Sequence, residues 1–313
     1  MIKFIPEAHK HSLGIVFIVV TTLILATIPV AIKEAIASLS AAIQFGIRFT
    51  IAAIILTPFV RNLNINLFRD GAILGILLFG IFATATIGLE TICANQASFI
   101  FGLNMVFVTL FEILFRKLIS IRSILAVIIA FTGMGVMSWD SGKPLIGDFW
   151  LLASAFCDAA YIIVLDKLSS QHSPIPLVTI QLWIVAILGI LWAAPELTNV
   201  DWNKQIEAIQ ASSGVLIYLS LVATVIVILL QTFAQQWITA SETALFFALE
   251  PVFGSIFAFL LLGETFSTRS FIGIVMVLIG IMLILIRPQI HESDLEPPQL
   301  QESTVPDQPS LIN

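Results

Sequence analysis

Long apolar runs divide this chain, and short polar connectors separate them. A helix needs about 20 mainly apolar residues to cross the hydrocarbon layer of a membrane. The runs that approach this length are Leu13–Ala31, Ala41–Phe59, Gly71–Leu89, Phe99–Phe115, Ile121–Trp139, Phe149–Leu165, Leu177–Ala194, Val215–Phe233, Ala244–Leu262 and Phe271–Ile286. They do not alternate between apolar and polar residues, which disfavours a β-barrel. The pattern therefore predicts an all-α integral membrane protein with ten transmembrane helices.

The composition supports a lipid environment. Hydrophobic residues make up 58% of the 313 residues and charged residues only 11%, whereas about a quarter of a typical soluble domain is charged. The lipid bilayer is therefore an expected partner. Nucleic acid is not, because the chain has no basic stripe. Cys93 and Cys157 lie in or beside apolar runs and are expected to be packing residues.

Three segments lie outside the apolar runs. Residues 1–12 form an amino-terminal tail, and residues 287–313 are rich in Pro, Gln, Glu and Ser, which predicts a disordered tail. Leu197–Ser213 is the longest connector. The spacing of Trp202 and Ile206 within it fits a short amphipathic helix at the membrane interface, although a plain loop is the alternative.

The positions of Lys and Arg predict the orientation. Ten helices place both termini on one side of the membrane, and that side would carry Lys3, Lys10, Arg61, Arg69, Arg116, Lys117, Arg122, Lys167 and Arg287. The opposite side would carry Lys33, Lys143, Lys204 and Arg269. Cytoplasmic loops are enriched in Lys and Arg. Both termini are therefore predicted to be cytoplasmic, with the protein in the plasma membrane or the inner membrane of the cell.

The two halves of the chain resemble each other. A shift of 133 residues pairs Gly14 with Gly147 and Ala26 with Ala159, and a shift of 146 pairs Thr86 with Thr232, Ala94 with Ala240, Leu103 with Leu249 and Phe107 with Phe253. The change of shift falls at the long connector. Each copy, 13–139 and 147–286, would hold five helices, so the second enters the membrane from the opposite side. Inverted repeats are frequent in secondary transporters, with the substrate site near the midplane between the copies.

A motif in the second half resembles a known family. Residues 249–264 read Leu-Glu-Pro-Val-Phe-Gly-Ser-Ile-Phe-Ala-Phe-Leu-Leu-Leu-Gly-Glu and are similar to the ninth-helix motif of EamA-domain proteins of the drug/metabolite transporter superfamily. The resemblance covers residues 14–139 and 147–286. It implies ten helices in two EamA repeats, a central cavity open alternately to each side, and export or exchange of amino acids, metabolites or drugs.

The first copy departs from the family pattern at two places. Met105 stands where the first repeat often has Pro, and Arg116-Lys117 stands where Gly-Glu would be expected. Because proline interrupts a helix, the fourth helix is expected to be less kinked than the ninth.

Three charged residues fall near the middle of apolar runs, namely Arg48, Asp158 and Glu250. A charge at this depth is costly and marks a candidate functional site. Arg48 is expected to pair with Asp158 or Glu250, which leaves one carboxylate over. We hypothesise that this carboxylate titrates during transport and couples flux to protons. The alternative is that Arg48 only closes a structural ion pair.

Uncharged polar residues extend the candidate site. Asn104 and Gln231 lie deep in their predicted helices, and Gln181 is the repeat equivalent of Arg48. Their amide groups could bind a zwitterionic or hydroxylated solute. These three residues are therefore candidates for substrate binding or coupling.

Two prolines are predicted to kink their helices. Pro29 leaves the carbonyl of Leu25 without its helical partner, and Pro251 does the same for Phe247. Free carbonyls at membrane depth are tolerated where they line a cavity or find polar partners. The prolines therefore either mark the solute path or are packing kinks.

Motifs typical of enzymes are missing from the sequence, including the HExxH, GxSxG and Walker A patterns. No metal and no cofactor is expected. The sequence therefore predicts a secondary transporter, not driven by ATP, for a small-molecule solute. A membrane-embedded enzyme of lipid metabolism and a non-transporting scaffold or sensor are the alternatives. A homodimer stays open.

Overall fold

A computed structural model describes residues 7–60, 63–116, 121–139, 146–198, 202–265 and 267–285. Within these ranges the chain forms helices and no strand, and eight spans are long and apolar enough to cross a membrane. Two shorter apolar helices cover Val127–Val136 and Phe271–Leu283. The protein is therefore an all-helical, multi-pass membrane protein. The predicted tail at residues 287–313 lies outside the described residues.

The helices follow one another with short connections. In the first half they are α1 (Glu7–Leu25), α2 (Ile28–Ile36), α3 (Ala41–Leu56), the short η2 (Thr57–Phe59), α4 (Ile65–Thr91), α5 (Ala94–Phe101), α6 (Asn104–Arg116) and α7 (Ile121–Trp139). In the second half they are α8 (Ile146–Ser169), α9 (Pro174–Leu197), α10 (Trp202–Ala211), α11 (Ser213–Ser220), the π-helix η3 (Leu221–Ile226), α12 (Val227–Ala234), α13 (Ala240–Phe247), α14 (Glu250–Leu262) and α15 (Thr268–Leu285).

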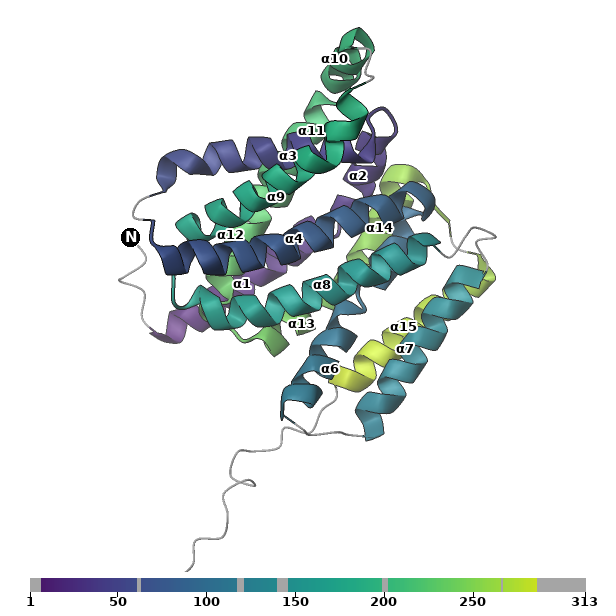
Figure 1. Ribbon diagram of the computed structural model, residues 1–313. Coiled ribbons are helices and arrows are strands. Elements are labelled where there is room, and N and C mark those ends of the chain that lie inside the picture. Colours follow the sequence, from purple (N-terminus) through teal and green to yellow (C-terminus); the bar gives the residue numbers. More distant parts are fainter. Residues whose placement is uncertain are drawn as a thin grey trace, which may run out of the picture.

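Helix α10 confirms that the long connector contains a short helix. It projects from one end of the bundle, beyond α11 and α9 (Figure 1). No residue of α10 is buried. Trp202 and Ile206 are exposed on it. Its position at the membrane interface stays a prediction.

Several helices start where side chains satisfy free backbone N–H groups. The hydroxyl of Ser40 accepts a hydrogen bond from the amide of Ile43 at the start of α3, and the side chain of Asn64 accepts one from Leu67 at the start of α4. Such caps replace the partners that the first turn of a helix lacks. They fix where these membrane spans begin.

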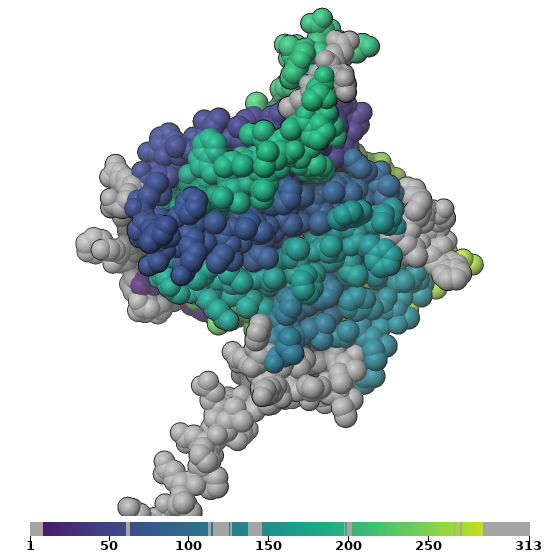
Figure 2. All heavy atoms as spheres, viewed as in Figure 1, coloured from purple at the N-terminus to yellow at the C-terminus, as the bar shows by residue number. Residues whose placement is uncertain are grey.

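The bundle is built from a few extensive helix pairs. Helix α7 packs on α15, α3 on α9, α5 on α14, and α1 on α12, while α4 lies between α8 and α9 (Figure 1). In the space-filling view α10 projects from the body that the other helices form (Figure 2). Large apolar side chains are also exposed on the outside of the bundle, for example Phe259 and Leu260 on α14, which are 56% and 66% exposed. An exposed apolar surface of this kind fits a lipid surround.

Small residues allow the closest helix contacts. At Gly71 an added Cβ would lie 2.8 Å from a side-chain carbon of Ile180, and at Gly75 it would lie 2.8 Å from Ile184. Both isoleucines are on α9. Glycines spaced by four residues let helix backbones approach in this way, so α4 and α9 pack tightly along this face.

Two membrane spans are interrupted just before a proline. Helix α1 ends at Leu25 and α2 begins at Ile28, so Pro29 stands at the start of the new helix. In the second half, α13 ends at Phe247 and α14 begins at Glu250, immediately before Pro251. At each break, the carbonyl four residues before the proline, that of Leu25 or Phe247, lacks the N–H donor that a helix would supply.

The fourth predicted helix is no more continuous than the ninth, and its weaker bend stays a prediction. That span is also interrupted, because α5 ends at Phe101 and α6 begins at Asn104. The break includes Gly102, which lies directly against the ring of Pro251. A glycine at this contact lets the two interrupted spans approach closely, so the break does not require a proline at position 105.

Candidate functional site

A cavity of about 60 Å³ lies inside the bundle, between the two halves of the chain. Its lining comes from α1, α2, α4 and α5 in the first half and from α8, α12 and α14 in the second. The lining residues are Leu25, Ile28, Pro29, Ile32, Leu78, Ile81, Phe82, Ala85, Leu89, Phe101, Ser154, Ala155, Asp158, Tyr161, Val227, Ile228, Gln231 and Glu250. This volume has room for several water molecules, and so for a compact ligand.

Four residues proposed from the sequence line this cavity. They are Pro29, Asp158, Gln231 and Glu250. Apart from a few polar groups the wall is aliphatic and aromatic, which is typical of sites that bind small organic molecules. No Lys or Arg is among the described lining residues, so the formal charge of the wall is negative.

Asn104 is not part of the lining but contacts it. Its amide nitrogen donates a hydrogen bond of 2.6 Å to the Oδ2 atom of Asp158. Asn104 is the first residue of α6, directly after the break at Gly102, and it is only 1% exposed. The interruption of the fourth span therefore places this amide where it orients the carboxylate of Asp158.

Glu250 lines the cavity from the start of α14. It is 6% exposed, and no described residue forms a hydrogen bond or an ion pair with its carboxylate. The free N–H groups and the dipole at a helix amino terminus favour a negative charge there. The break before Glu250 thus supplies a favourable position for a carboxylate, but no counter-charge.

Tyr161 belongs to the site and was missed from the sequence. Its hydroxyl donates a hydrogen bond of 2.9 Å to the side-chain oxygen of Gln181, so Gln181 contacts the cavity wall without lining it. Tyr161 follows Asp158 by three residues on α8, and residues at this spacing share a helix face. With only two tyrosines in the chain, that spacing was the signal that could have identified it.

The predicted ion pair of Arg48 is wrong. Its Nε donates to the hydroxyl of Thr224 at 2.7 Å, and its Nη2 donates to the carbonyl of Ala223 at 3.1 Å. Neither Asp158 nor Glu250 pairs with it. The physical reason is the π-helix η3, whose wider turn offers polar groups to a guanidinium inside the bundle.

Arg48 is nevertheless next to the cavity wall. It is fully buried, and its guanidinium carbon lies 4.7 Å from the ring centre of Phe82 and 5.0 Å from that of Phe49. Aromatic faces attract a guanidinium at this distance. Phe82 lines the cavity and Arg48 does not, so Arg48 contacts a ring of the cavity wall from outside the lining.

The bundle is held together at the end away from the cavity. The side chain of Gln236, after α12, donates to the carbonyls of Ser169 and His172 at 2.7 and 3.1 Å. The hydroxyl of Ser169 donates to the carbonyl of Gln235 at 2.8 Å. These bonds join the end of α8 to the α12–α13 connection. We call these four residues the polar latch.

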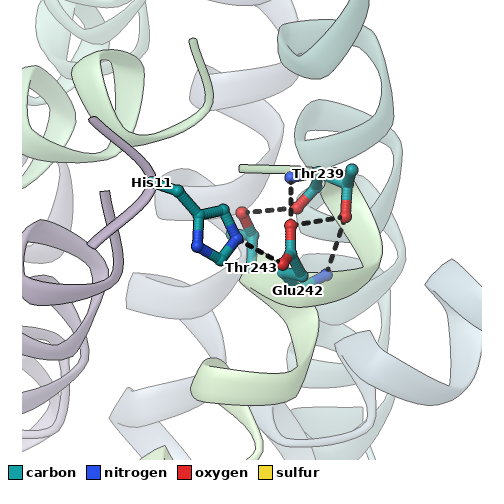
Figure 3. Close-up of polar contacts among 4 residues, drawn as sticks. All are labelled: His11, Thr239, Glu242 and Thr243. Carbon is teal, nitrogen blue, oxygen red and sulfur yellow. Dashed lines mark hydrogen bonds and ion pairs between the residues drawn. The ribbon is translucent and has the colours of Figure 1, made fainter. Parts of the chain in front are cut away.

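A second contact joins α1 to α13. The imidazole Nε2 of His11 lies 2.8 Å from the Oε1 atom of Glu242 (Figure 3). Glu242 also forms a capping box with Thr239, in which each side chain bonds the other residue's backbone. The start of α13 is therefore fixed both to its own first turn and to α1.

Replacing Gln236 with leucine is expected to open the polar latch. Two partly buried carbonyls would lose their donor, at a cost of about 1–3 kcal/mol. Hydrogen exchange of residues 162–172 and 231–240 should then accelerate about tenfold, because exchange reports local opening. Gln171→Leu is the control, since Gln171 bonds only the Lys167 carbonyl of its own turn. Equal exchange rates in the two variants would mean that these bonds do not hold the end of α8 to the α12–α13 connection.

Among the described residues, no group of three or more His, Cys, Asp or Glu side chains is placed to hold a metal ion. The described lining of the cavity offers two carboxylates, an amide, hydroxyl groups and apolar side chains.

The comparison with known proteins identifies the family. The EamA-like transporter family matches this chain twice, over residues 12–139 and 145–286. An uncharacterized transporter of Archaeoglobus fulgidus is 26% identical over 83% of this chain and 82% of its own length. The uncharacterized transporter YdfC of Bacillus subtilis is 26% identical over 67% of this chain and 68% of its own.

A solved structure shares the fold. It is described only as the crystal structure of a protein, and it aligns with a TM-score of 0.60 and 13% identity over 88% of this chain and 97% of that one. At that identity the likeness concerns the fold alone. With the apolar spans, the cavity between the halves and the two family matches together, the chain belongs to the EamA-like transporter family, as a multi-pass membrane transporter of the drug/metabolite type.

Proposed function

We propose that this protein is a secondary transporter that moves a small organic solute by alternating access. Its architecture is ten transmembrane helices in two inverted five-helix repeats. The observation that carries the proposal is the cavity, because both halves contribute to its wall. The first half supplies apolar side chains, and the second supplies polar groups, among them Asp158 and Glu250. A solute held there can be exposed to either side when the halves exchange conformations.

The helix contacts support the inverted repeat. In a two-fold arrangement, some helices pack on their own counterpart, and every other pair occurs twice. Helices α3 and α9, and α7 and α15, are counterparts under the sequence shifts, and each of these two pairs is in contact. The pair α5 and α14 recurs as α13 and α6. The pair α4 and α8 recurs as α12 and α1. The two separate family matches divide the chain at the same place.

The described conformation resembles one state of such a cycle. The cavity uses the later half of α4, from Leu78 to Leu89, and the earlier half of α8, from Ser154 to Tyr161. The polar latch joins the opposite end of α8 to the α12–α13 connection. In the proposed cycle the latch breaks when the cavity closes at the first end and opens at the second.

Orientation and coupling belong to the same proposal. The distribution of Lys and Arg favours cytoplasmic termini in the plasma or inner membrane. The absence of a nucleotide-binding motif in the sequence favours an ion or solute gradient as the energy source. Protons are the proposed coupling ion, because Asp158 and Glu250 face the cavity and could exchange them.

The test begins with cells that lack or overproduce the protein. A comparison of their metabolites should show solute pools that change in opposite directions. The purified protein in liposomes should then carry those solutes down an imposed gradient. If no pool changes and no flux appears, the transporter proposal fails.

Filling the cavity should stop this flux without unfolding the protein. Ala85 lines the cavity from α4 and is 4% exposed, so Ala85→Phe would occupy space that a solute needs. Ile76→Phe is the matched control on the same helix, because Ile76 is 58% exposed on the outer surface. We expect at least a tenfold loss of flux for the first variant only. Equal flux in both would place the solute path elsewhere.

A further inference from the structure

The partners of Arg48 leave the cavity more negative than the sequence suggested. The sequence suggested that Arg48 would neutralise one of two acids, leaving a single spare charge. Instead, Arg48 bonds Thr224 and the Ala223 carbonyl, while Asp158 and Glu250 both line the cavity. Lys33 lines a neighbouring pocket at the end of α2, together with Glu90. The cavity wall thus carries two carboxylates and no fixed cation among the described residues.

The carboxylate of Glu250 is the clearest sign of a missing partner. It is 94% buried (6% exposed) and faces the cavity without a hydrogen bond from any described residue. Burying a charge without a partner is costly. Asp158 by contrast receives the amide of Asn104. An occupant of the cavity that supplies positive charge beside Glu250 would offset this cost.

The rest of the cavity wall favours a ligand with an apolar body. Leucine, isoleucine, valine and phenylalanine side chains surround the polar groups. The aromatic rings of Phe82, Phe101 and Tyr161 are part of this wall, and aromatic faces attract organic cations. With a cavity of about 60 Å³, the fitting ligand is compact.

The same groups disfavour an anion or a zwitterion. A carboxylate in the ligand would lie in the same cavity as the carboxylates of Asp158 and Glu250, and like charges in a low-dielectric site repel. Two donors beside the carboxylates are engaged, because the Tyr161 hydroxyl donates to Gln181 and Asn104 donates to Asp158. The amide of Gln231 donates to Gln235 at 3.4 Å. Arg48 is not among the lining residues and contacts the ring of Phe82.

We therefore infer that the cavity binds a small organic monocation, an amine with an apolar body, whose ammonium group pairs with Glu250 and whose apolar part contacts the side chains of α4, α5 and α12. This inference rests on the proposed transport function and specifies its substrate class. Asp158, oriented by Asn104, supplies the second negative charge.

The test uses four probes with the same branched apolar group. They are 3-methylbutylammonium, a cation; 3-methylbutan-1-ol, which is neutral; 3-methylbutanoate, an anion; and leucine, a zwitterion. Equilibrium binding to the purified full-length protein is measured for each. We expect the cation to bind at least tenfold more tightly than the other three. Tighter binding of leucine or of the anion would overturn the inference, and so would no binding of any probe.

Variants then assign the ammonium site. Glu250→Gln should weaken binding of the cation at least tenfold. Asp158→Asn should weaken it too, so that the assignment does not depend on the folding of a single variant. Glu242→Gln is the matched control, since Glu242 lies on the same span, outside the cavity, and glutamine also suits its capping box. Cation binding unchanged in both cavity variants would overturn the inference.

The outcome can be separated from that of the transport proposal. If liposomes carry leucine or an anion while the cation does not bind, the substrate class is wrong and the transport function stands. If the cation binds but no solute crosses the membrane in liposomes, the transport function fails and the binding site stands.

Discussion

Glu250→Gln is expected to remove the pH dependence of solute flux and to lower flux at neutral pH at least tenfold. Glutamine keeps the size of the side chain but carries no charge and cannot exchange a proton. Glu250 faces the cavity without a partner among the described residues, so its charge is available to a proton or to a solute. Under the proposed coupling, a transporter that has lost this group has no means of linking the two fluxes.

The measurement is flux into liposomes at several pH values, with and without an imposed pH gradient, using the solute found by the metabolite comparison. Asp158 and Tyr161 on α8 are the other titratable groups among the described lining residues. Asp158→Asn therefore shows whether the pH dependence belongs to one carboxylate or to both. Glu242→Gln controls for loss of an acid elsewhere on the same span. If the pH profile of Glu250→Gln matches that of the unchanged protein, proton coupling through Glu250 is ruled out.

Much of the fold follows from patterns that the sequence displays directly. Apolar runs of sufficient length predict membrane spans because lipid cannot satisfy backbone polar groups outside a helix. The prolines at 29 and 251 stand beside the interruptions of their spans because a proline removes one backbone donor. The amphipathic spacing after Leu197 predicts the helix α10. Each of these signals is local, and each depends on residues close together in the chain.

The partners of the buried polar groups could not be predicted in the same way. The charge at Arg48 suggested a pair with an acid, because attraction between opposite charges is the simplest way to bury a guanidinium. Its actual partners are a hydroxyl and a carbonyl on a π-helix. Nothing in the sequence of Leu221–Ile226 marks that wider turn, so Thr224 could not be recognised as a partner.

The break at Gly102 shows the same limit for the backbone. The missing proline at position 105 suggested a more regular fourth helix. The glycine instead lies against Pro251, a residue far away in the sequence. A contact between distant segments lies at this break, and the residues around Gly102 do not reveal it, just as tertiary packing often overrides propensity.

A glycine pair on α7 gives the second prediction of large effect. Gly133 lies on the face that packs against α15: an added Cβ would lie 2.7 Å from the carbonyl oxygen of Gly273, 2.7 Å from the Cβ of Met276 and 2.8 Å from the amide nitrogen of Val277. Two of these three atoms belong to the backbone, which cannot move aside as a flexible side chain can. Gly135, two residues along, has nothing within 4 Å of an added Cβ.

Gly133→Leu should therefore force α7 away from α15, while Gly135→Leu should add only an apolar side chain to an exposed face. Inserting a large side chain into a close contact typically lowers the free energy of unfolding by about 1–3 kcal/mol and sometimes more. We expect a loss of about 3 kcal/mol at Gly133, because the new side chain would clash with backbone atoms of α15. Thermal unfolding of the purified variants in detergent measures this, with Gly133→Ala as an intermediate step. Equal melting temperatures for the two leucine variants would mean that α7 and α15 do not pack as described. A selective loss at Gly133 would support the pairing of the last helix of each proposed repeat, because the contact that fails is the one between them.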